Sequence, residues 1–164
     1  EICACLVGSE MCIRDSLGGN FNGYMNDMSR VFSIGKLPEE AYTAHQVCLD
    51  IQTKIASIAK PGIACEVLYD IAAEIAKEAG FADKFMGKGQ QAKFIGHGIG
   101  LEINEAPVLA PRMKQQLEPG MVFALEPKIV IPGVGPVGIE NSWVVTNEGI
   151  EKLTNCNEEI IELS

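Results

Sequence analysis

The spacing of apolar residues predicts two amphipathic helices in the first half of the chain. The first opens at Pro38 and ends before the pair Pro61-Gly62, which stops a helix. The second runs from about Cys65 to Ala79 and ends at Gly80, where a left-handed residue closes a helix at low cost. Apolar side chains recur every three or four residues in both segments, so one face of each is predicted to be buried: Ala44, Val47, Cys48, Ile51, Ile55 and Ile58, then Val67, Leu68, Ile71, Ala72 and Ile75.

The other regular segments read as strands. Residues 21–34 are rich in Asn, Gly, aromatic and β-branched types and predict a hairpin, with "NFNG" as a four-residue loop. Short apolar runs broken by Gly and Pro predict a late group of strands in "FIGHGIGLEI", "MVFALEPKIVI", "VGPVGIENSWVVT" and a closing segment near "IEKLT". A hairpin, two helices and a late group of strands predict an α+β fold rather than alternating βαβ units.

The first sixteen residues differ from the rest of the chain. They contain Cys3, Cys5 and Cys12, which are half of the six cysteines, and they lack helical or strand periodicity before a switch at Leu17. "LVGSEMCIRDS" resembles one reading frame of a transposase adapter used in DNA sequencing libraries. We therefore expect residues 1–16 to be a non-native leader on an N-terminally truncated protein, with native sequence over 17–164. The alternative is a genuine, irregular N-terminal strand.

Composition narrows the class of protein. A chain of 164 residues with 47% hydrophobic content is long enough for one domain with a core. The net charge of −9 argues against a nucleic-acid partner, because neutralising phosphates needs clustered Lys and Arg. Apolar runs are far shorter than the roughly 20 residues that cross a bilayer, so we expect no membrane partner and a cytoplasmic protein. The cysteines have no zinc-type spacing.

Four residues carry candidate chemistry. His97 stands between glycines in "FIGHGIG", which leave room for something to approach the ring, although a lone His is more often a hydrogen-bonded core residue. Asp27, Glu126 and Glu140 lie inside apolar strands, and a buried carboxylate costs several kcal/mol unless a cation compensates it. Apart from Lys128, no cation stands beside the two glutamates, so a metal is the economical partner. The alternative is that each glutamate reaches water at a strand end.

One imidazole with three carboxylates suits manganese, iron or cobalt, with zinc as a further candidate. Such sets commonly hold two ions, and this one is a single oxygen donor short. A four-residue hairpin loop places Ser16 directly opposite Asp27, so we expect that a carboxylate was lost at position 16. Asp15 does not substitute, because a shift of one residue turns its side chain to the other face. His45, beside the apolar face of the first helix, is interpreted as a solvated or capping residue.

The assembled pattern resembles the pita-bread metallopeptidases, which include methionine aminopeptidases, Xaa-Pro aminopeptidases and prolidases. "GGNFNGYMNDMSRVFSIG" is similar to the family's first aspartate block, "FIGHGIGLEINEAP" to its histidine block, and "FALEP" and "GIENSWVVT" to its two glutamate blocks. "LEINEAPVLAP" resembles the Xaa-Pro branch, the prolidases and Xaa-Pro aminopeptidases, most closely. Where that branch usually has His-Glu, this chain has Asn104-Glu105, which leaves substrate preference open.

The resemblance implies a creatinase/aminopeptidase-like fold, in which helices pack on the outer face of a curved antiparallel sheet. It implies hydrolysis of the N-terminal bond of Xaa-Pro peptides with two divalent ions, manganese being favoured over cobalt, iron or zinc. Asp27, His97, Glu126 and Glu140 are then four of five metal ligands, and the fifth falls on Ser16. Glu126 and His97 take the catalytic roles, with Glu126 transferring the proton.

By the same resemblance, Asn104 and Gly96 contact the peptide substrate, and the intact protein is a candidate homodimer. The fragment itself is then expected to be impaired. Two other interpretations stay open. A non-peptidase hydrolase or lyase on the same fold is suggested by Asn104, and a metal-free binding module is the third candidate.

Overall fold

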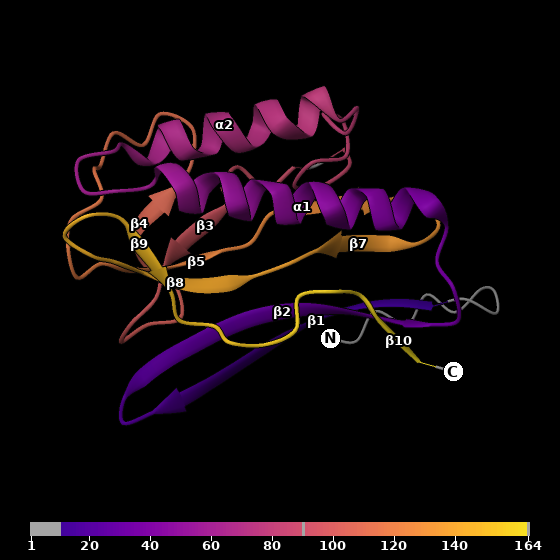
Figure 1. Cartoon of the computed structure of the whole chain (residues 1–164), viewed down its shortest axis with the longest axis horizontal. Coiled ribbons are helices and arrows are strands. Elements are labelled where there is room, and N and C mark those ends of the chain that lie inside the picture. The colour runs from indigo at the N-terminus through magenta and orange to yellow at the C-terminus, as the bar shows by residue number, and fades with distance from the viewer. Residues whose placement is uncertain (1–10, 90, 164) are drawn as a thin grey trace.

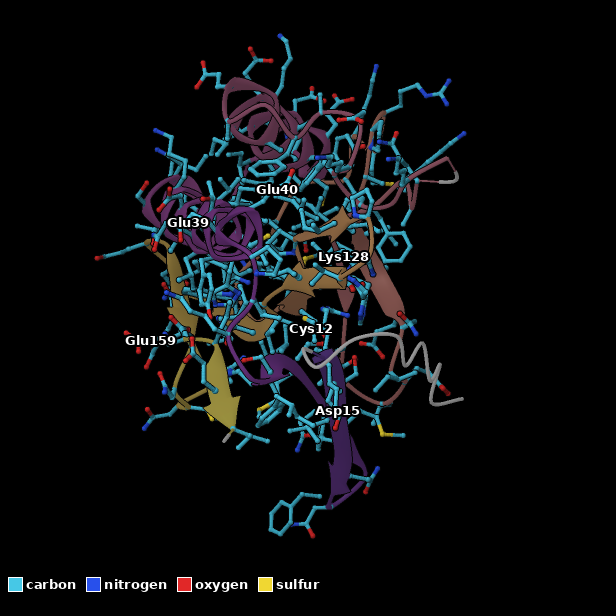
Figure 2. The ribbon with its side chains drawn as sticks, turned by 90° about the vertical axis from the view of Figure 1, so that its right-hand side faces the viewer. Cys12, Asp15, Glu39, Glu40, Lys128 and Glu159 are labelled. Atoms are coloured by element: carbon cyan, nitrogen blue, oxygen red, sulfur yellow. The ribbon has the colours of Figure 1, made fainter. Side chains whose placement is uncertain are left out.

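A computed structural model describes residues 11–89 and 91–163. The chain forms three layers, in which two helices lie over strands of a sheet and a long N-terminal hairpin lies below those strands (Figure 1). A view turned by 90° shows the same order from top to bottom (Figure 2). The predicted α+β class is confirmed. In the part of the chain that the structure describes, no helix is both long and apolar enough to span a membrane.

Both predicted helices are present. They are α1 (Glu39–Ile58) and α2 (Cys65–Glu78), and they end before Pro61 and Gly80 as the sequence indicates. The buried face of α1 is the predicted one, except that Ile58 is only half-buried. The face of α2 is rotated from the prediction, since Val67 is 39% exposed. The fully buried side chains of α2 are Cys65, Leu68, Ala72 and Ala76, and α2 packs on α1.

The hairpin turns more tightly than predicted. β1 (Met11–Phe21) and β2 (Tyr24–Ile34) pair along their whole length and are joined by two residues, Asn22 and Gly23, in place of the expected four-residue loop. Both have positive φ angles, 52° and 87°, as the type I′ turn requires. Asn-Gly is the dipeptide that this turn favours. Because the turn uses only these two residues, Phe21 and Tyr24 on either side of it are the last pair of the β1–β2 ladder.

This tighter turn changes the register. Ser16 lies opposite Ser29, and Gly18 lies opposite Asp27, so the predicted direct pairing of Ser16 with Asp27 is wrong. Ser16 nevertheless shares a face with Asp27, because cross-strand partners point the same way and side chains alternate along a strand. Asp15 pairs with Arg30 on the opposite face, as expected.

The structure describes only part of the predicted leader, residues 1–16. Residues 1–10 lie outside the described residues, whereas 11–16 lie in β1 and are paired throughout with β2. A paired strand is compatible with either origin of this segment, so its non-native origin stays a prediction.

The late strands form one main sheet and two smaller groups. The main sheet has the order β4-β3-β5-β8-β9, and all its pairings are antiparallel. Its strands are β3 (Gly96–Gly98), β4 (Glu105–Leu109), β5 (Val122–Leu125), β8 (Asn141–Val145) and β9 (Ile150–Lys152). A separate pair and one strand parallel to β2 complete the set: β6 (Lys128–Ile131), β7 (Gly135–Gly138) and β10 (Ile161–Leu163).

Side chains alternate along the main sheet between two faces, the core face toward the helices and the face toward the hairpin, which we call the site face. The indole of Trp143 donates to the side chain of Gln52 on α1 at 3.1 Å, so Trp143 faces the helices. Ser142, the residue before it, faces the hairpin. His97 lies opposite Ala124, and Ala124 lies opposite Ser142, so all three share the face that the hairpin covers.

His45 is a buried residue of α1, so its interpretation as solvated is wrong. Its Nε2 lies 2.7 Å from the carbonyl oxygen of Glu158. Burial lowers the pKa of His45 below the ordinary 6.5, against the opposing hydrogen bond to that carbonyl. The imidazole is therefore held neutral in the folded chain.

We expect the folded chain to lose stability through His45 on mild acidification. Because its folded-state pKa is the lower one, the unfolded chain binds the proton more readily, and stability falls as pH drops from about 6.5 through the folded-state pKa. His45→Gln keeps an amide donor near the position of Nε2 and does not titrate, so its unfolding midpoint in urea should depend less on pH in that interval. Parallel pH profiles for both proteins would contradict this assignment.

Candidate metal centre

Three of the predicted ligands meet on the site face of the sheet. Asp27 comes from β2, His97 from β3, and Glu140 from the residue before β8. One ligand atom from each lies within 4.8 Å of the other two. Atoms that share one ion lie up to about 4 Å apart, since each bond is roughly 2.0–2.2 Å long. The donor set therefore fits a single divalent cation after small shifts.

The ring of His97 is oriented for metal binding. Its Nδ1 lies 3.1 Å from the carbonyl oxygen of Gly98, an acceptor, so Nδ1 carries the proton and donates it. Nε2 then has a free lone pair and lies 3.8 Å from Oε1 of Glu140 and 3.9 Å from Oε1 of Glu126. A backbone carbonyl behind a histidine is a common arrangement that fixes the tautomer of a metal ligand.

Glu126 lies beside the three-ligand group and directly after β5. Its Oε2 lies 3.1 Å from Nζ of Lys128 and 3.6 Å from Nη2 of Arg14. Apart from Lys128, the strands that carry the two glutamates have no cation beside them, but the fold adds one, because Arg14 approaches both glutamates from β1. No local sequence pattern links Arg14 to residues more than a hundred positions away, so this contact depends on the fold.

Glu140 is deeply buried and hydrogen-bonded. Ser29 Oγ donates to its Oε2 at 2.5 Å. Burial raises the pKa of Glu140, the Ser29 hydrogen bond lowers it, and the negative charges of Glu126 and Asp27 raise it further. Burial likewise raises the pKa of Asp27, and the negative charge of Glu126 raises it further. A divalent cation would compensate both carboxylates.

Sequence reasoning missed Ser29. It lies two residues from Asp27 on the same face of β2, and that spacing was the available signal. Its hydroxyl also lies 2.9 Å from Oγ of Ser16. Position 16 therefore reaches the edge of the site through Ser29, although it does not face Asp27 directly.

Removing the Ser29 hydroxyl should weaken metal binding. Ser29→Ala leaves Oε2 of Glu140 without its donor, and loss of such a supporting hydrogen bond typically costs 10–100-fold in metal affinity, so we expect about that increase in the Kd for Mn²⁺ by calorimetry. Ser33→Ala is the matched control, because Ser33 is equally buried on β2 and its hydroxyl has no partner among the described residues. Equal affinities for the two variants would remove Ser29 from the site.

The first predicted substrate residue, Asn104, borders a cavity. Asn104 lines a cavity of about 210 Å³ together with His97, Phe94, Glu105 and Val108, which suits a side chain that touches a ligand at the site. The cavity is bounded mainly by apolar atoms.

Gly96 has a packing reason that the prediction did not include. A Cβ built on Gly96 would lie 2.4 Å from the carbonyl oxygen of Ala124, and one on Gly98 would lie 2.1 Å from that of Ala106. The missing side chains therefore admit neighbouring backbone, and the expectation that they leave room for an approaching ligand is wrong for both glycines. Contact between substrate and the backbone of Gly96 stays a prediction.

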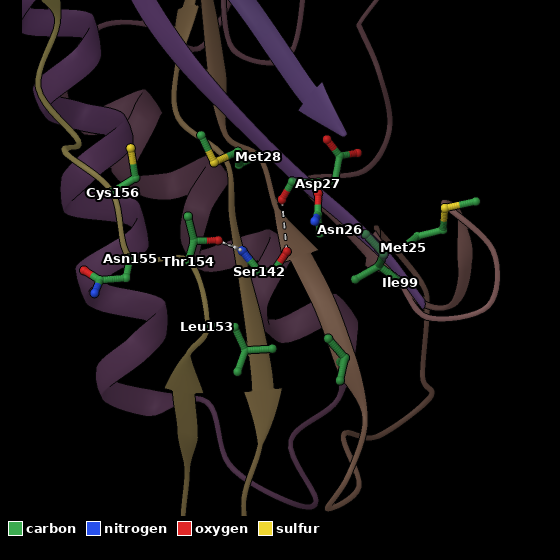
Figure 3. Close-up of a pocket in the computed structure, with 11 residues that line it drawn as sticks. Met25, Asn26, Asp27, Met28, Ile99, Ser142, Leu153, Thr154, Asn155 and Cys156 are labelled. Carbon is green, nitrogen blue, oxygen red and sulfur yellow. Dashed lines mark hydrogen bonds between the residues drawn. The ribbon is translucent and has the colours of Figure 1, made fainter. Parts of the chain in front are cut away.

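A second cavity of about 290 Å³ adjoins Asp27 from the side of the β9–β10 segment (Figure 3). Ser142 connects its walls, since its hydroxyl donates to the backbone oxygen of Asp27 at 3.0 Å and its amide donates to Thr154 Oγ1 at 2.9 Å. The first bond ties the part of β2 that carries Asp27 to the main sheet, and the second ties the segment after β9 to it.

The chain is similar in sequence to known metallopeptidases. The model of Metallopeptidase family M24 matches residues 8–147. The Xaa-Pro dipeptidase of Pyrococcus furiosus is 35% identical over 145 residues, which are 88% of this chain and 40% of that protein. The chain thus spans about 40% of the length of its curated relatives.

Solved structures give the same picture. The X-Pro aminopeptidase from Thermotoga maritima superposes with a TM-score of 0.85 at 32% identity, over 93% of this chain and 42% of that one. The prolidase from Pyrococcus furiosus superposes with a TM-score of 0.81 at 34% identity, over 89% and 42%.

Proposed function

Because the chain belongs to metallopeptidase family M24, we propose that the full-length protein cleaves the N-terminal peptide bond of Xaa-Pro peptides. Membership confirms the family resemblance inferred from the four sequence blocks, and the neighbouring structures confirm the pita-bread fold. The observation that carries the proposed activity is the convergence of Asp27, His97 and Glu140 within 4.8 Å, with Glu126 beside them.

We propose two divalent ions in the full-length protein, with manganese favoured and cobalt, iron or zinc as alternatives. The hard, oxygen-rich donor set of Asp27, Glu126, Glu140 and His97 supports this choice. Ions bound there would supply Lewis-acid activation of a water and of the scissile carbonyl. His97 would hold an ion through Nε2, the nitrogen left free by its bond to Gly98.

The side chains supply the proton chemistry and the orientation of substrate. Glu126 would accept a proton from the attacking water and return it to the leaving nitrogen, a role that suits a carboxylate at the edge of the ligand group. Asn104, in the cavity beside His97, would donate from its amide to a substrate carbonyl. Gly96 would present its backbone there.

For this chain we propose impaired turnover. Position 16 carries a hydroxyl where the family resemblance implies a carboxylate, so one oxygen donor of a two-ion site is missing. Cytoplasmic location, the lack of a nucleic-acid or membrane partner and a homodimer of the intact protein stay predictions.

A non-peptidase hydrolase or lyase on the same fold is the second candidate, and Asn104 favours it, because an amide cannot become cationic as the usual His can. A metal-free binding module is disfavoured by the convergence of His97 Nε2 with Oε1 of Glu126 at 3.9 Å and Oε1 of Glu140 at 3.8 Å.

A substrate panel separates these candidates. Full-length protein, loaded with Mn²⁺, is offered Xaa-Pro dipeptides, longer Xaa-Pro peptides and matched peptides with Ala in place of Pro. We expect cleavage that depends on proline and is lost on chelation. Absence of cleavage in every peptide, with metal bound, would reject the peptidase and leave the second candidate.

A further inference from the structure

Arg14 places a positive charge inside the candidate metal centre. It lies in β1 on the same face as Ser16, and its side chain is 9% exposed. Its Nη2 lies 3.6 Å from Oε2 of Glu126 and 3.7 Å from Oε2 of Glu140. Within residues 11–89 and 91–163, no other Lys or Arg comes within 4.0 Å of both glutamates, since Lys128 reaches Glu126 alone.

The guanidinium neutralises charge without forming directed hydrogen bonds. Both of its distances to the glutamates exceed the 2.7–3.2 Å of an N–H···O bond. Nε and Nη2 are buried and have no hydrogen-bond partner among the described residues. An ordinary structural arginine would use its fork of donors on a carboxylate. Arg14 is therefore attracted to the two glutamates by charge alone, without hydrogen bonds to them.

The charges leave room for one divalent ion. Asp27, Glu126 and Glu140 bring three negative charges, and Arg14 and Lys128 bring two positive charges. The net charge of these five side chains is therefore one negative charge, and binding one divalent ion changes it to one positive charge. A second divalent ion would add two more positive charges to a poorly solvated site, where repulsion between like charges is strong.

From this geometry we propose that Arg14 takes the place of the second cation, so that this chain binds a single divalent ion on Asp27, His97 and Glu140. The inference rests on the proposed function, because it assumes that the three-ligand group binds metal. Arg14 lies between the two glutamates that an ion shared by them would have to contact. Nε2 of His97 instead lies 3.9 Å from the other oxygen, Oε1, of Glu126 and 3.8 Å from Oε1 of Glu140.

Manganese binding to this chain tests the proposal without reference to activity. Calorimetry gives the number of Mn²⁺ ions per chain, and electron paramagnetic resonance distinguishes an isolated ion from a spin-coupled pair. We expect one ion and an isolated-ion spectrum for the wild type. Arg14→Met removes the charge at similar length and should tighten binding of a second ion at least about tenfold, with appearance of the coupled signal.

Arg112→Met is the matched control, because Arg112 is exposed and its loss changes the net charge of the chain equally. Arg14→Gln is a second neutral variant for the case in which Arg14→Met does not fold by circular dichroism. Two ions in the wild type, or an unchanged second affinity in the folded Arg14 variant, would overturn the inference and leave the proposed function intact. Absence of any binding in all variants would overturn both. Failure of the full-length protein to cleave peptides would reject the proposed function alone.

Discussion

Replacing Glu126 with glutamine in the full-length enzyme is expected to lower kcat on an Xaa-Pro peptide by about 10²–10⁴-fold. Glutamine keeps the volume of the side chain and can still accept a hydrogen bond from Lys128, which lies 3.1 Å from Oε2. It cannot take a proton from water at neutral pH. Steady-state kinetics on the Mn²⁺-loaded enzyme measures the loss.

The metal content of the same variant decides what the loss means. If Glu126 acts mainly as proton acceptor, the three ligands Asp27, His97 and Glu140 should still retain an ion in Glu126→Gln. Glu118→Gln, an exposed site, is the control for loss of one carboxylate. Unchanged kcat with metal retained would exclude Glu126 from proton transfer, and loss of all metal would make it chiefly a ligand.

The elements with strong local signals were predictable from the sequence. α1 was, because its apolar stripe faces the sheet along most of its length. The hairpin was predicted as an element, but its register was not, since "NFNG" reads equally as a four-residue loop or as strand ends around Asn22-Gly23. The choice between them depends on whether Phe21 pairs with Tyr24, which is a cross-strand contact.

The N-terminal half of β1 was not predicted as a strand, because its pattern of apolar and polar residues is inverted. Ile13 is 41% exposed and Leu17 is 43% exposed, whereas the side chain of Arg14 between them is only 9% exposed. Apolar side chains therefore face outward and a cation faces inward, the reverse of the alternation by which a half-buried strand is recognised. The inward cation is tolerated because carboxylates from distant parts of the chain lie next to it.

The carboxylates of the site were predictable for the complementary reason. Asp27, Glu126 and Glu140 interrupt apolar runs, and that local cost signals a compensating partner whatever the fold. The partners themselves, Arg14 and Ser29, carried no such signal. Their roles arise when β1 and β2 are laid across the main sheet.

The close approach of β3 and β5 gives the largest expected effect on stability. Gly96→Ala would put a Cβ at 2.4 Å from the carbonyl oxygen of Ala124 on the neighbouring strand. Backbone cannot give way as a flexible side chain does, so the two strands must separate. We expect a loss of about 3 kcal/mol in the free energy of unfolding, at the upper end for overpacking, measured by urea denaturation.

Gly149→Ala provides the matched control, because its Cβ would lie at an ordinary 3.7 Å from the carbonyl oxygen of Ala59 and its φ is not positive. We expect its stability to stay within about 0.5 kcal/mol of wild type. Gly96→Ala should also weaken Mn²⁺ binding, since displaced β3 carries His97 away from Glu140. Wild-type stability for Gly96→Ala would show that β3 and β5 lie further apart than the structure places them. Wild-type stability with lost binding would instead return Gly96 to a direct role at the site.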